Sequence, residues 1–332
     1  MSVLSNSESN GETPDAIRAS APTRPIRMLP SFRERVWGRT DLSPYFPDQH
    51  PAQPVGEVWY TAEDNVTDWG PTLGELLARH LSILGTAQDP RQPHLCPLLV
   101  KLLFTSSRLS VQVHPDDDYA AEHHHSLGKT EAWYVLDAAP PGEVGVGFRQ
   151  PITAERLRRS ALSGEIEELI EWRKVHPGDT IFVPAGMVHA IGAGLTICEI
   201  QQNSDITYRL YDYGRPRELH LEHGCRVSKL GHAANSPVPA TLAPGRIQLA
   251  ECEYFRIEHL NITKPLRISA SSPHYLLLMC IRGQGQIAGH RAEPGQLWLA
   301  PAHGDEFALE GSGSEWILTY RASEPFEGIA VL

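Results

Sequence analysis

Polar residues on one face of an otherwise apolar strand constrain the fold of this chain more than any other feature. Residues 109–114 read Leu-Ser-Val-Gln-Val-His. Alternate residues of a strand point to the same face, so Ser110, Gln112 and His114 share one face and the apolar residues share the other. A Gln and a His directed into a small barrel need a polar group between them. A metal ion meets that need for both side chains.

A second segment combines a turn, a strand and a further histidine. Residues 178–189 follow the form G-x5-P-x-G-x2-H and end at His189, a pattern typical of the cupin barrel. The chain also has 27 glycines, 27 prolines and many short apolar runs at even spacing. Such a sequence favours jelly rolls. We therefore expect an all-β-dominated fold of two cupin (jelly-roll) barrels with a few short helices.

The chain divides into four expected regions. The G-x5-P turn recurs at Gly295–Pro301, but no Gln-x-His pair accompanies it, and Glu306 stands where His189 stands in the first copy. This second block is therefore predicted to be a barrel without a metal site. We expect a disordered tail at residues 1–23 and a catalytic metal-binding cupin domain at residues 24–235. A linker is expected at residues 231–245, and a C-terminal cupin domain at residues 246–332.

Helices are expected in two places. Thr72 and Glu75 form a capping-box pattern ahead of leucines at helical spacing, Leu73, Leu76, Leu77 and Leu81. Residues 153–172 are predicted to hold two short helices, one capped by Thr153 and one starting at Ser163 or Gly164, with Ile166, Leu169 and Ile170 on its apolar face. Strands of the first barrel are expected at 56–60, 98–104, 108–114, 130–136, 180–183, 189–191, 195–201 and 207–213.

Charge and composition exclude several classes of function. The formal net charge of −11 argues against nucleic acid or an anionic membrane as the main partner. The longest apolar runs are too short to cross a bilayer, and the N-terminus has no signal-peptide pattern. The five cysteines are scattered and include no C-x-x-C pair, so we expect reduced thiols in a cytoplasmic protein.

Four residues can be gathered into one open metal site. Glu131 lies on the expected strand at 130–136 and shares a face with Lys129, and it joins Gln112, His114 and His189. The set leaves room for water or substrate, which is typical of catalytic rather than structural sites. Because a neutral Gln replaces the imidazole of oxidative cupins, the redox-inert ion Zn²⁺, one per chain, is expected.

The residues from 99 to 217 resemble the type I mannose-6-phosphate isomerases, a family of zinc-dependent cupins, and are closest to the shorter bacterial form. The shared segments are Val100–Leu103, Ser110–Asp117, Gly128–Tyr134, Pro184–Ile191 and Asp205–Gly214, with weaker similarity at 34–38, 56–59 and 72–76. The resemblance implies zinc on Gln112, His114, Glu131 and His189. It also implies catalytic roles for Arg209, Lys129 and Asp205, and substrate contacts for Lys101, Ser110 and Arg209.

The implied reaction interconverts mannose 6-phosphate and fructose 6-phosphate through a cis-enediol. Lys129 beside a dication is expected to have a lowered pKa and to act as base. The longer family form has a His where this chain has Gly128, so the acid that opens the sugar ring stays undetermined. The nearby run His123–His125 has two interpretations. It supplies that acid in place of the missing His, or, more simply, it is a solvated loop.

Three other functions fit some of these features. They are another cupin sugar-phosphate isomerase, a metal-dependent oxygenase and a non-catalytic sugar-binding cupin. The Gln ligand counts against an oxygenase, and Lys101, Lys129, Asp205 and Arg209 together exceed what a pure binder needs. The partner is expected to be a small sugar phosphate, with no nucleic acid or membrane, and the chain a monomer or homodimer.

Overall fold

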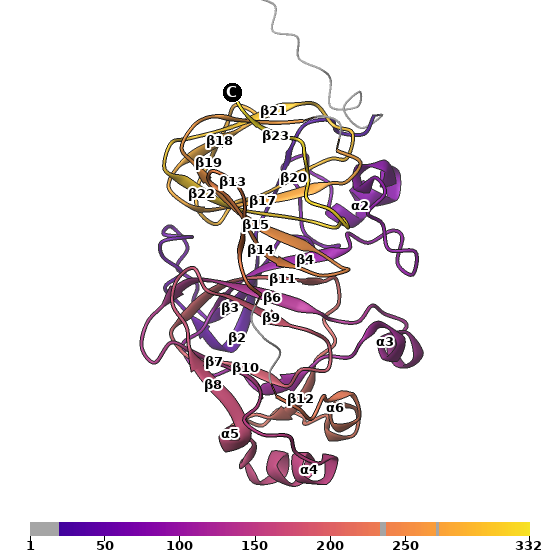
Figure 1. Cartoon of the computed structure of the whole chain (residues 1–332), viewed down its shortest axis with the longest axis vertical. Helices are drawn as coiled ribbons and strands as arrows, with labels where there is room; N and C mark the ends of the chain where they lie inside the picture. Colours follow the sequence, from indigo (N-terminus) through magenta and orange to yellow (C-terminus); the bar gives the residue numbers. More distant parts are fainter. Residues whose placement is uncertain (1–19, 233–236, 270–271) are drawn as a thin grey trace, which may run out of the picture.

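Residues 20–232, 237–269 and 272–332 are described by the computed structural model, which has two β lobes one above the other (Figure 1). Its strands form four antiparallel sheets, two in each lobe, and the expected β-dominated cupin fold is confirmed. Most of the tail expected at 1–23, and residues 233–236 of the expected linker, lie outside the described residues.

The lower lobe of Figure 1 contains a six-stranded and a five-stranded sheet. Its six-stranded sheet has the order β2 (Ser31–Arg39), β3 (Val55–Trp59), β4 (Leu98–Phe104), β11 (Leu195–Gln202), β6 (Glu131–Ala138) and β9 (Thr180–Val183). The facing five-stranded sheet has the order β12 (Tyr208–Tyr211), β5 (Val111–Val113), β10 (His189–Ile191), β7 (Glu143–Phe148) and β8 (Ile170–Lys174).

The upper lobe is formed by the C-terminal residues and one strand from near the N-terminus. Its seven-stranded sheet has the order β1 (Ile26–Met28), β20 (Leu297–Ala300), β17 (Leu276–Arg282), β22 (Ser314–Tyr320), β15 (Arg256–Ile262), β14 (Arg246–Glu251) and β13 (Ala240–Ala243). Its five-stranded sheet has the order β19 (His290–Ala292), β18 (Gly285–Ile287), β21 (Phe307–Glu310), β16 (Leu266–Ile268) and β23 (Ile329–Val331).

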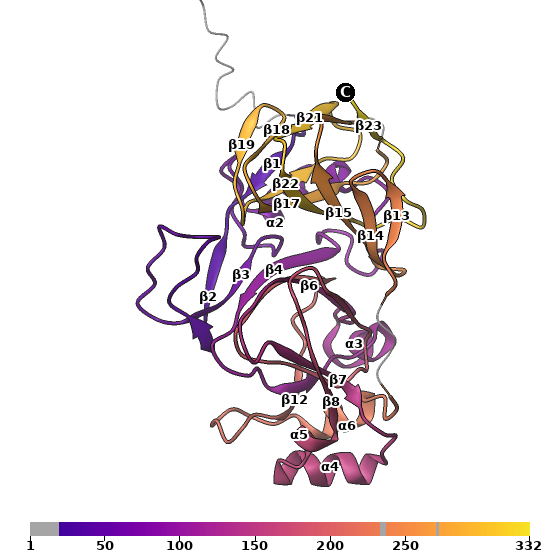
Figure 2. The same cartoon turned by 60° about the vertical axis from the view of Figure 1, so that its left-hand side comes forward.

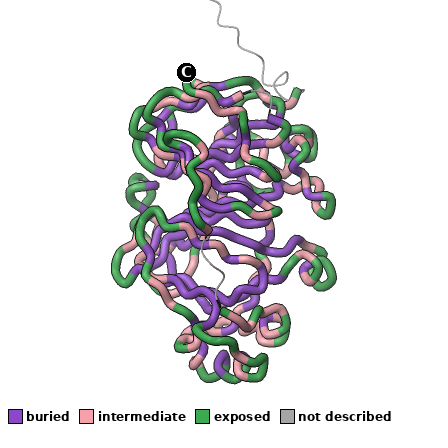
Figure 3. Tube along the Cα trace, in the orientation of Figure 1, coloured by how far each residue is buried: buried purple, intermediate pink, exposed green. Residues whose placement is uncertain are grey.

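A shared apolar core joins the two lobes (Figures 2 and 3). It contains Val100 and Leu102 of β4 together with Leu277 and Leu299 of the upper lobe, all buried. Side chains alternate along a strand, so Lys101, between these two residues, is directed to the other face, into the lower barrel. Packing of one sheet against the second lobe thereby decides which β4 side chains line the barrel interior.

The predicted helix caps are present. In α2 (Leu73–Arg79), Thr72 accepts a hydrogen bond from the Glu75 backbone and Glu75 bonds back to Thr72, completing the capping box. Leu81, predicted on the same helix, instead begins the 3₁₀ turn η1 (Leu81–Leu84). In α4 (Ala154–Ser163), the Thr153 side chain caps the first turn, as predicted.

The second short helix expected in residues 153–172 is shorter than predicted. Helix α5 (Ile166–Leu169) has Glu165 at its N-cap position, and Ile170 belongs to strand β8. The strand expected at 108–114 forms ladder pairs only over Val111–Val113, and the expected linker ends at β13. Elements that the sequence pattern did not predict are β2, β7, β8, α3 (Asp117–His124) and α6 (Leu221–Val227).

The internal repeat of the two lobes is visible in the backbone. Gly178 and Gly295 both have positive φ angles, of 98° and 87°, and each turn leads into a strand two residues later, β9 and β20. Positive φ suits glycine because it has no Cβ. Glu306, the counterpart of His189, lies on the surface with its carboxylate 3.4 Å from the Arg267 guanidinium.

Candidate metal centre and active site

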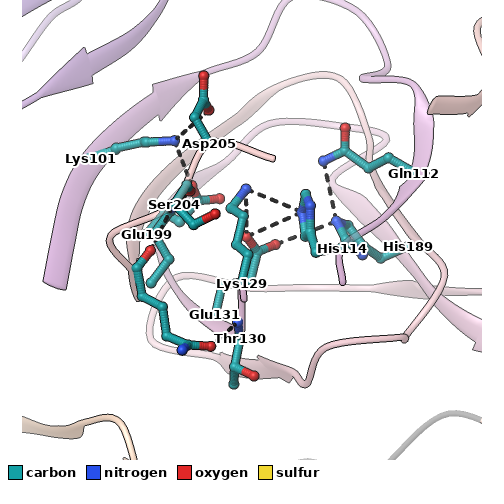
Figure 4. A network of polar contacts seen from close by, with 12 residues as sticks. Lys101, Gln112, His114, Lys129, Thr130, Glu131, His189, Glu199, Ser204 and Asp205 are labelled. Atoms are coloured by element: carbon teal, nitrogen blue, oxygen red, sulfur yellow. Dashed lines mark hydrogen bonds and ion pairs between the residues drawn. The ribbon is translucent and has the colours of Figure 1, made fainter. Parts of the chain in front are cut away.

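Three neighbouring strands of the five-stranded sheet bring the predicted residues together. Gln112 of β5 is the register partner of His189 of β10 on one side and of Arg209 of β12 on the other. Glu131 begins β6 in the facing sheet, where it pairs with Gln201. The interior between the two sheets therefore receives side chains from both (Figure 4).

His114, Glu131 and His189 form a buried cluster whose ligand atoms all lie within 4.8 Å of one another. Nε2 of His114 lies 3.5 Å from Oε2 of Glu131, and Nε2 of His189 lies 3.4 Å from Oε1 of the same carboxylate. All three side chains are almost fully inaccessible to solvent. Within the described residues, this is the one His, Cys, Asp and Glu group with the spacing of a metal site.

Backbone carbonyls set the tautomer of both imidazoles. Nδ1 of His114 bonds to the carbonyl of Ile206, and Nδ1 of His189 bonds to the carbonyl of Met187, each at 2.8 Å. A proton held on Nδ1 leaves the Nε2 lone pair facing the cluster, as in metal-bound histidines. Burial lowers the pKa of His189 to about 4 and that of His114 well below its ordinary value, so both rings stay neutral near pH 7.

The fourth predicted ligand, Gln112, lies at the edge of the same cluster. Its amide nitrogen is 3.2 Å from Nε2 of His189, and its oxygen accepts a hydrogen bond from Ser110. A half-turn about the last side-chain bond would exchange the two atoms and present the oxygen to the cluster. Ser110 and Gln112 therefore point the same way, as the strand alternation predicted.

The unsatisfied atoms of the cluster fit a cation. Oε2 of Glu131 is buried and accepts no well-directed hydrogen bond, although the Lys129 ammonium lies 3.0 Å away. An electron pair left unused on a buried carboxylate, beside two imidazole nitrogens, is a donor set that divalent metals bind. The residues present therefore suit a metal ion.

Lys129 lies inside the cluster rather than at its rim. Its ammonium is 3.0 Å from Glu131 and 3.1 Å from Nε2 of His114 (Figure 4). Burial alone would lower the pKa of Lys129, but the charges of Glu131, Glu199 and Asp205 outweigh burial and raise the pKa above its ordinary value. The lowered pKa expected for this lysine therefore depends on the positive charge of a bound dication.

The charge pairs of Lys101 include a residue that the sequence pattern did not indicate. The buried Lys101 ammonium lies 3.6 Å from Glu199, 3.7 Å from Asp205 and 4.4 Å from the Trp59 ring. Glu199 is the register partner of Lys101 in the β4–β11 ladder. Burial and the charge of Glu131 raise the pKa of Glu199 to about 7. The sequence could have indicated Glu199, because it is the one acidic residue in the apolar run 195–200.

A cavity of about 400 Å³ lies beside this cluster, with Gln112 and Lys129 in its lining. It is lined by Arg35, Trp37, Glu57, Lys101, Leu103, Leu109, Ser110, Gln112, Lys129, Glu199, Asp205, Thr207, Arg209 and Arg217. Volumes of this order are typical of small-molecule sites. Every residue predicted to be catalytic or substrate-binding lines it, and four of its residues are Arg or Lys in addition to Lys129.

Arg209 keeps donor capacity toward this cavity. Its guanidinium donates to the carbonyl of Glu218, and its buried Nε has no hydrogen-bond partner among the described residues. Asp212, three residues further along the chain, pairs with Arg215 and Arg217 rather than with Arg209. The charge of Arg209 is therefore not consumed by a neighbouring carboxylate.

The histidine run lies outside the cavity and is exposed to solvent, as the solvated-loop interpretation expected, but it is helical rather than a loop. His123 and His124 belong to α3, and His125 caps its C-terminus. The His124 ring contacts Tyr208, whose side chain leaves β12 on the face opposite Arg209. Since β12 separates the run from the cavity, none of the three lines it.

All five cysteines are free, as predicted. None of the described helices combines the length and the apolar content needed to span a membrane.

Comparison with known proteins gives the same family over most of the chain. Residues 26–146 match the family model described as phosphomannose isomerase type I, catalytic domain. Mannose-6-phosphate isomerase ManA of Bacillus subtilis is 38% identical, with 87% of this chain and 96% of that protein aligned. Mannose-6-phosphate isomerase of Streptococcus mutans is 33% identical, with 88% and 94% aligned.

Solved structures agree with the sequence relatives. The mannose 6-phosphate isomerase of Bacillus subtilis superposes with a TM-score of 0.81 at 30% identity, covering 89% of this chain and 99% of that one. A mannosephosphate isomerase of Archaeoglobus fulgidus, described as putative, shares the fold at 22% identity, with a TM-score of 0.74 and 91% and 99% coverage. With a metal-competent His-Glu-His cluster beside a cavity lined by arginines and lysines, and with relatives aligned over nearly their whole length, this chain belongs to the type I phosphomannose isomerases.

Proposed function

We propose that this chain interconverts mannose 6-phosphate and fructose 6-phosphate, as an aldose–ketose isomerase. The observation that carries the proposal is a metal-competent cluster beside one cavity, whose lining includes a lysine in contact with the cluster and further cationic groups such as Arg209. An oxygenase or a passive sugar binder has no use for the buried Lys129 beside Glu131. The relatives named above are mannose-6-phosphate isomerases.

The metal ligands in this proposal are Gln112, His114, Glu131 and His189, and the ion is one Zn²⁺ per chain. Two neutral imidazoles, a carboxylate and an amide oxygen suit a borderline-soft ion without redox chemistry. When bound, zinc would supply positive charge that polarises the sugar oxygens and favours a negatively charged enediolate. The carbonyls of Ile206 and Met187 hold both rings in the tautomer that such binding requires.

Lys129 is proposed as the group that moves the proton between C1 and C2 of the substrate. Its ammonium contacts the cluster directly, within 3.1 Å of two proposed ligands. Proton transfer needs a donor–acceptor pair within hydrogen-bond reach and a pKa near the working pH. Asp205, at the cavity rim beside Lys101, is proposed to assist by holding a substrate hydroxyl, because its carboxylate is largely exposed to the cavity.

Cationic and hydroxyl groups around the cluster are proposed to bind the rest of the substrate. Arg209 presents a planar guanidinium with an unused donor, which suits bidentate contact with phosphate or an enediolate. Lys101 adds a second positive charge, and Ser110 adds a hydroxyl on the face shared with Gln112. These three residues come from β12, β4 and the residue before β5, so the substrate would be held from both sheets.

The two lobes are proposed to be domains of unequal function. Residues 24–235 would form the catalytic cupin domain and residues 246–332 a cupin domain without a metal site. Strand β1 crosses this division, because Ile26 pairs with Leu299 of β20. The expected partner is a small sugar phosphate in the cytoplasm.

A coupled assay tests this function. The zinc-loaded chain is supplied with mannose 6-phosphate, and fructose 6-phosphate is followed through a coupling enzyme, with and without a chelator. We expect turnover that the chelator abolishes and that added Zn²⁺ restores. Glucose 6-phosphate serves as the comparison substrate. Activity without metal, or oxygen uptake by an iron-loaded chain, would contradict the proposal.

A further inference from the structure

Helix α3 begins at Asp117, three residues after His114, a proposed metal ligand. The segment His114-Pro-Asp-Asp117 is in contact with Gly128 and Lys129 of the next segment. The amide of Lys129 donates to the carbonyl of Pro115 at 3.0 Å, and the amide of Gly128 donates to Oδ1 of Asp117 at 2.8 Å. The backbone just before Glu131 is therefore held by the backbone just after His114.

A third segment joins the same carboxylate. Gln202, at the end of β11, donates from its side chain to Oδ1 of Asp117 at 2.9 Å. The oxygen of the same amide accepts from the backbone of Thr130 at 2.9 Å. Asp117 therefore holds Gly128 directly and Thr130 through Gln202, the residues on either side of Lys129.

The second oxygen of Asp117 faces the upper lobe. Oδ2 accepts from the hydroxyl of Tyr254 at 2.8 Å and lies 2.6 Å from the Arg91 guanidinium. Tyr254 lies between β14 and β15, in the C-terminal lobe. Arg91 also donates hydrogen bonds to both oxygens of Asp89. Asp89 accepts a further hydrogen bond, of 3.1 Å, from Arg321 of the C-terminal lobe.

We propose that Asp117 is a positioning residue that ties the Lys129–Glu131 segment to the C-terminal lobe through Tyr254. One carboxylate oxygen fixes the backbone that carries the proton-transfer lysine and a metal ligand, and the other oxygen is fixed by the lobe without a metal site. The C-terminal lobe then contributes to catalysis by holding this segment in place. The role of Asp117 rests on the proposed isomerase function.

Steric contacts support a fixed rather than a loose junction. A Cβ at Gly128 would lie 2.5 Å from the carbonyl carbon of Asp116 and 2.6 Å from the nitrogen of Asp117. The side chain of Asp117 is only 13% exposed, so water competes weakly for its hydrogen bonds. Small displacements of a reacting group are costly: about 1 Å can lower turnover on the order of 10²-fold.

Three variants of the zinc-loaded full chain test the role. Asp117→Ala removes both oxygens, Asp117→Asn keeps an acceptor for Gly128, and Tyr254→Phe removes only the hydroxyl. We expect kcat to fall roughly 10- to 100-fold in the first and several-fold in the other two. KM should change less than about twofold, because Arg209 and Lys101 lie on other strands. Zinc affinity should weaken about tenfold in Asp117→Ala, as for other groups that orient a ligand.

Matched controls separate positioning from simple stability. Asp116→Ala removes the cap of the same helix, a bond from the Tyr119 amide, and should lower the melting temperature while kcat stays within about twofold. Tyr45→Phe removes a tyrosine hydroxyl for which no hydrogen bond is seen in the described part of the chain. Because Tyr254 and Asp117 share one bond, Tyr254→Phe and Asp117→Asn should be non-additive in kcat.

Amide hydrogen exchange at Gly128 and Thr130 gives a readout that is independent of turnover. Faster exchange at these two amides in Asp117→Ala and Tyr254→Phe, with unchanged exchange in Asp116→Ala, supports the tie. Unchanged kcat, zinc affinity and exchange, with only a lower melting temperature, would overturn it. Should Asp117→Ala fail to fold, Tyr254→Phe decides. An inactive wild-type chain would count against the proposed function, while zinc affinity and exchange would still decide the role of Asp117.

Discussion

Gln112 and His189 lie directly opposite each other on neighbouring antiparallel strands, although they are 77 residues apart in the chain. The pairing places the amide of Gln112 3.2 Å from Nε2 of His189. Two short motifs therefore meet through a single ladder contact between β5 and β10. That contact is the geometric basis for the proposed metal site, which takes ligands from both motifs.

Removal of the metal should abolish turnover and leave the barrels folded. The cores of both lobes consist of buried apolar residues that do not depend on the cluster, so the circular dichroism spectrum should not change after dialysis against a chelator.

His189→Ala should bind zinc at least tenfold more weakly, by metal analysis after gel filtration. Tight binding of one equivalent by this variant would show that the ligand set is wrong.

Arg209→Ala should lower kcat by roughly 10²-fold, the usual scale for removal of an electrostatic stabiliser. The zinc content should stay at one per chain, because Arg209 is not a ligand. Arg209→Lys should recover only part of the rate, since an ammonium cannot reproduce a planar fork. A rise in KM at constant kcat would instead make Arg209 a ground-state binding residue.

Gly128→Ala should destabilise the fold by about 1–3 kcal/mol, the scale of overpacking a tight junction. The reason is steric, because the new methyl group would overlap the backbone of Asp116 and Asp117. Urea unfolding measures the change. Gly231→Ala is the control, since its Cβ would meet no atom within 4 Å, and it should be close to neutral.

Asp89 should contribute to stability at neutral pH and lose that contribution in acid. Hydrogen bonds from Arg91 lower the pKa of Asp89 to about 2, below the value of about 3.9 for an unfolded chain. The contribution is therefore complete above about pH 4 and is lost as the pH falls through about 2. Urea midpoints of wild type and Asp89→Asn should differ most at pH 6, and the difference should shrink as the pH falls toward 2. Asp48→Asn, at an exposed aspartate, should follow wild type throughout this range.

The local sequence pattern was sufficient to predict which side chains converge on the cluster. A period of two places Ser110, Gln112 and His114 on one side of a strand, and Lys129 beside Glu131, whatever the rest of the chain does. The capping box at Thr72 and the glycine turns at Gly178 and Gly295 are also local, and the structure has them. The length of α5 was mispredicted, because pairing with β7 draws Ile170 into a strand.

Tertiary structure alone decided which distant groups complete the site. Glu199 reaches Lys101 through the register of β4 and β11, and Asp117 reaches Tyr254 through the packing of two lobes. The histidine run near His124 was placed outside the cavity by the same packing. A sequence specifies the face of a strand through local sterics, but register and lobe contacts depend on burial summed over many residues. The ligand types were thus set by the sequence itself, and the charges and supports around them by the assembled barrels.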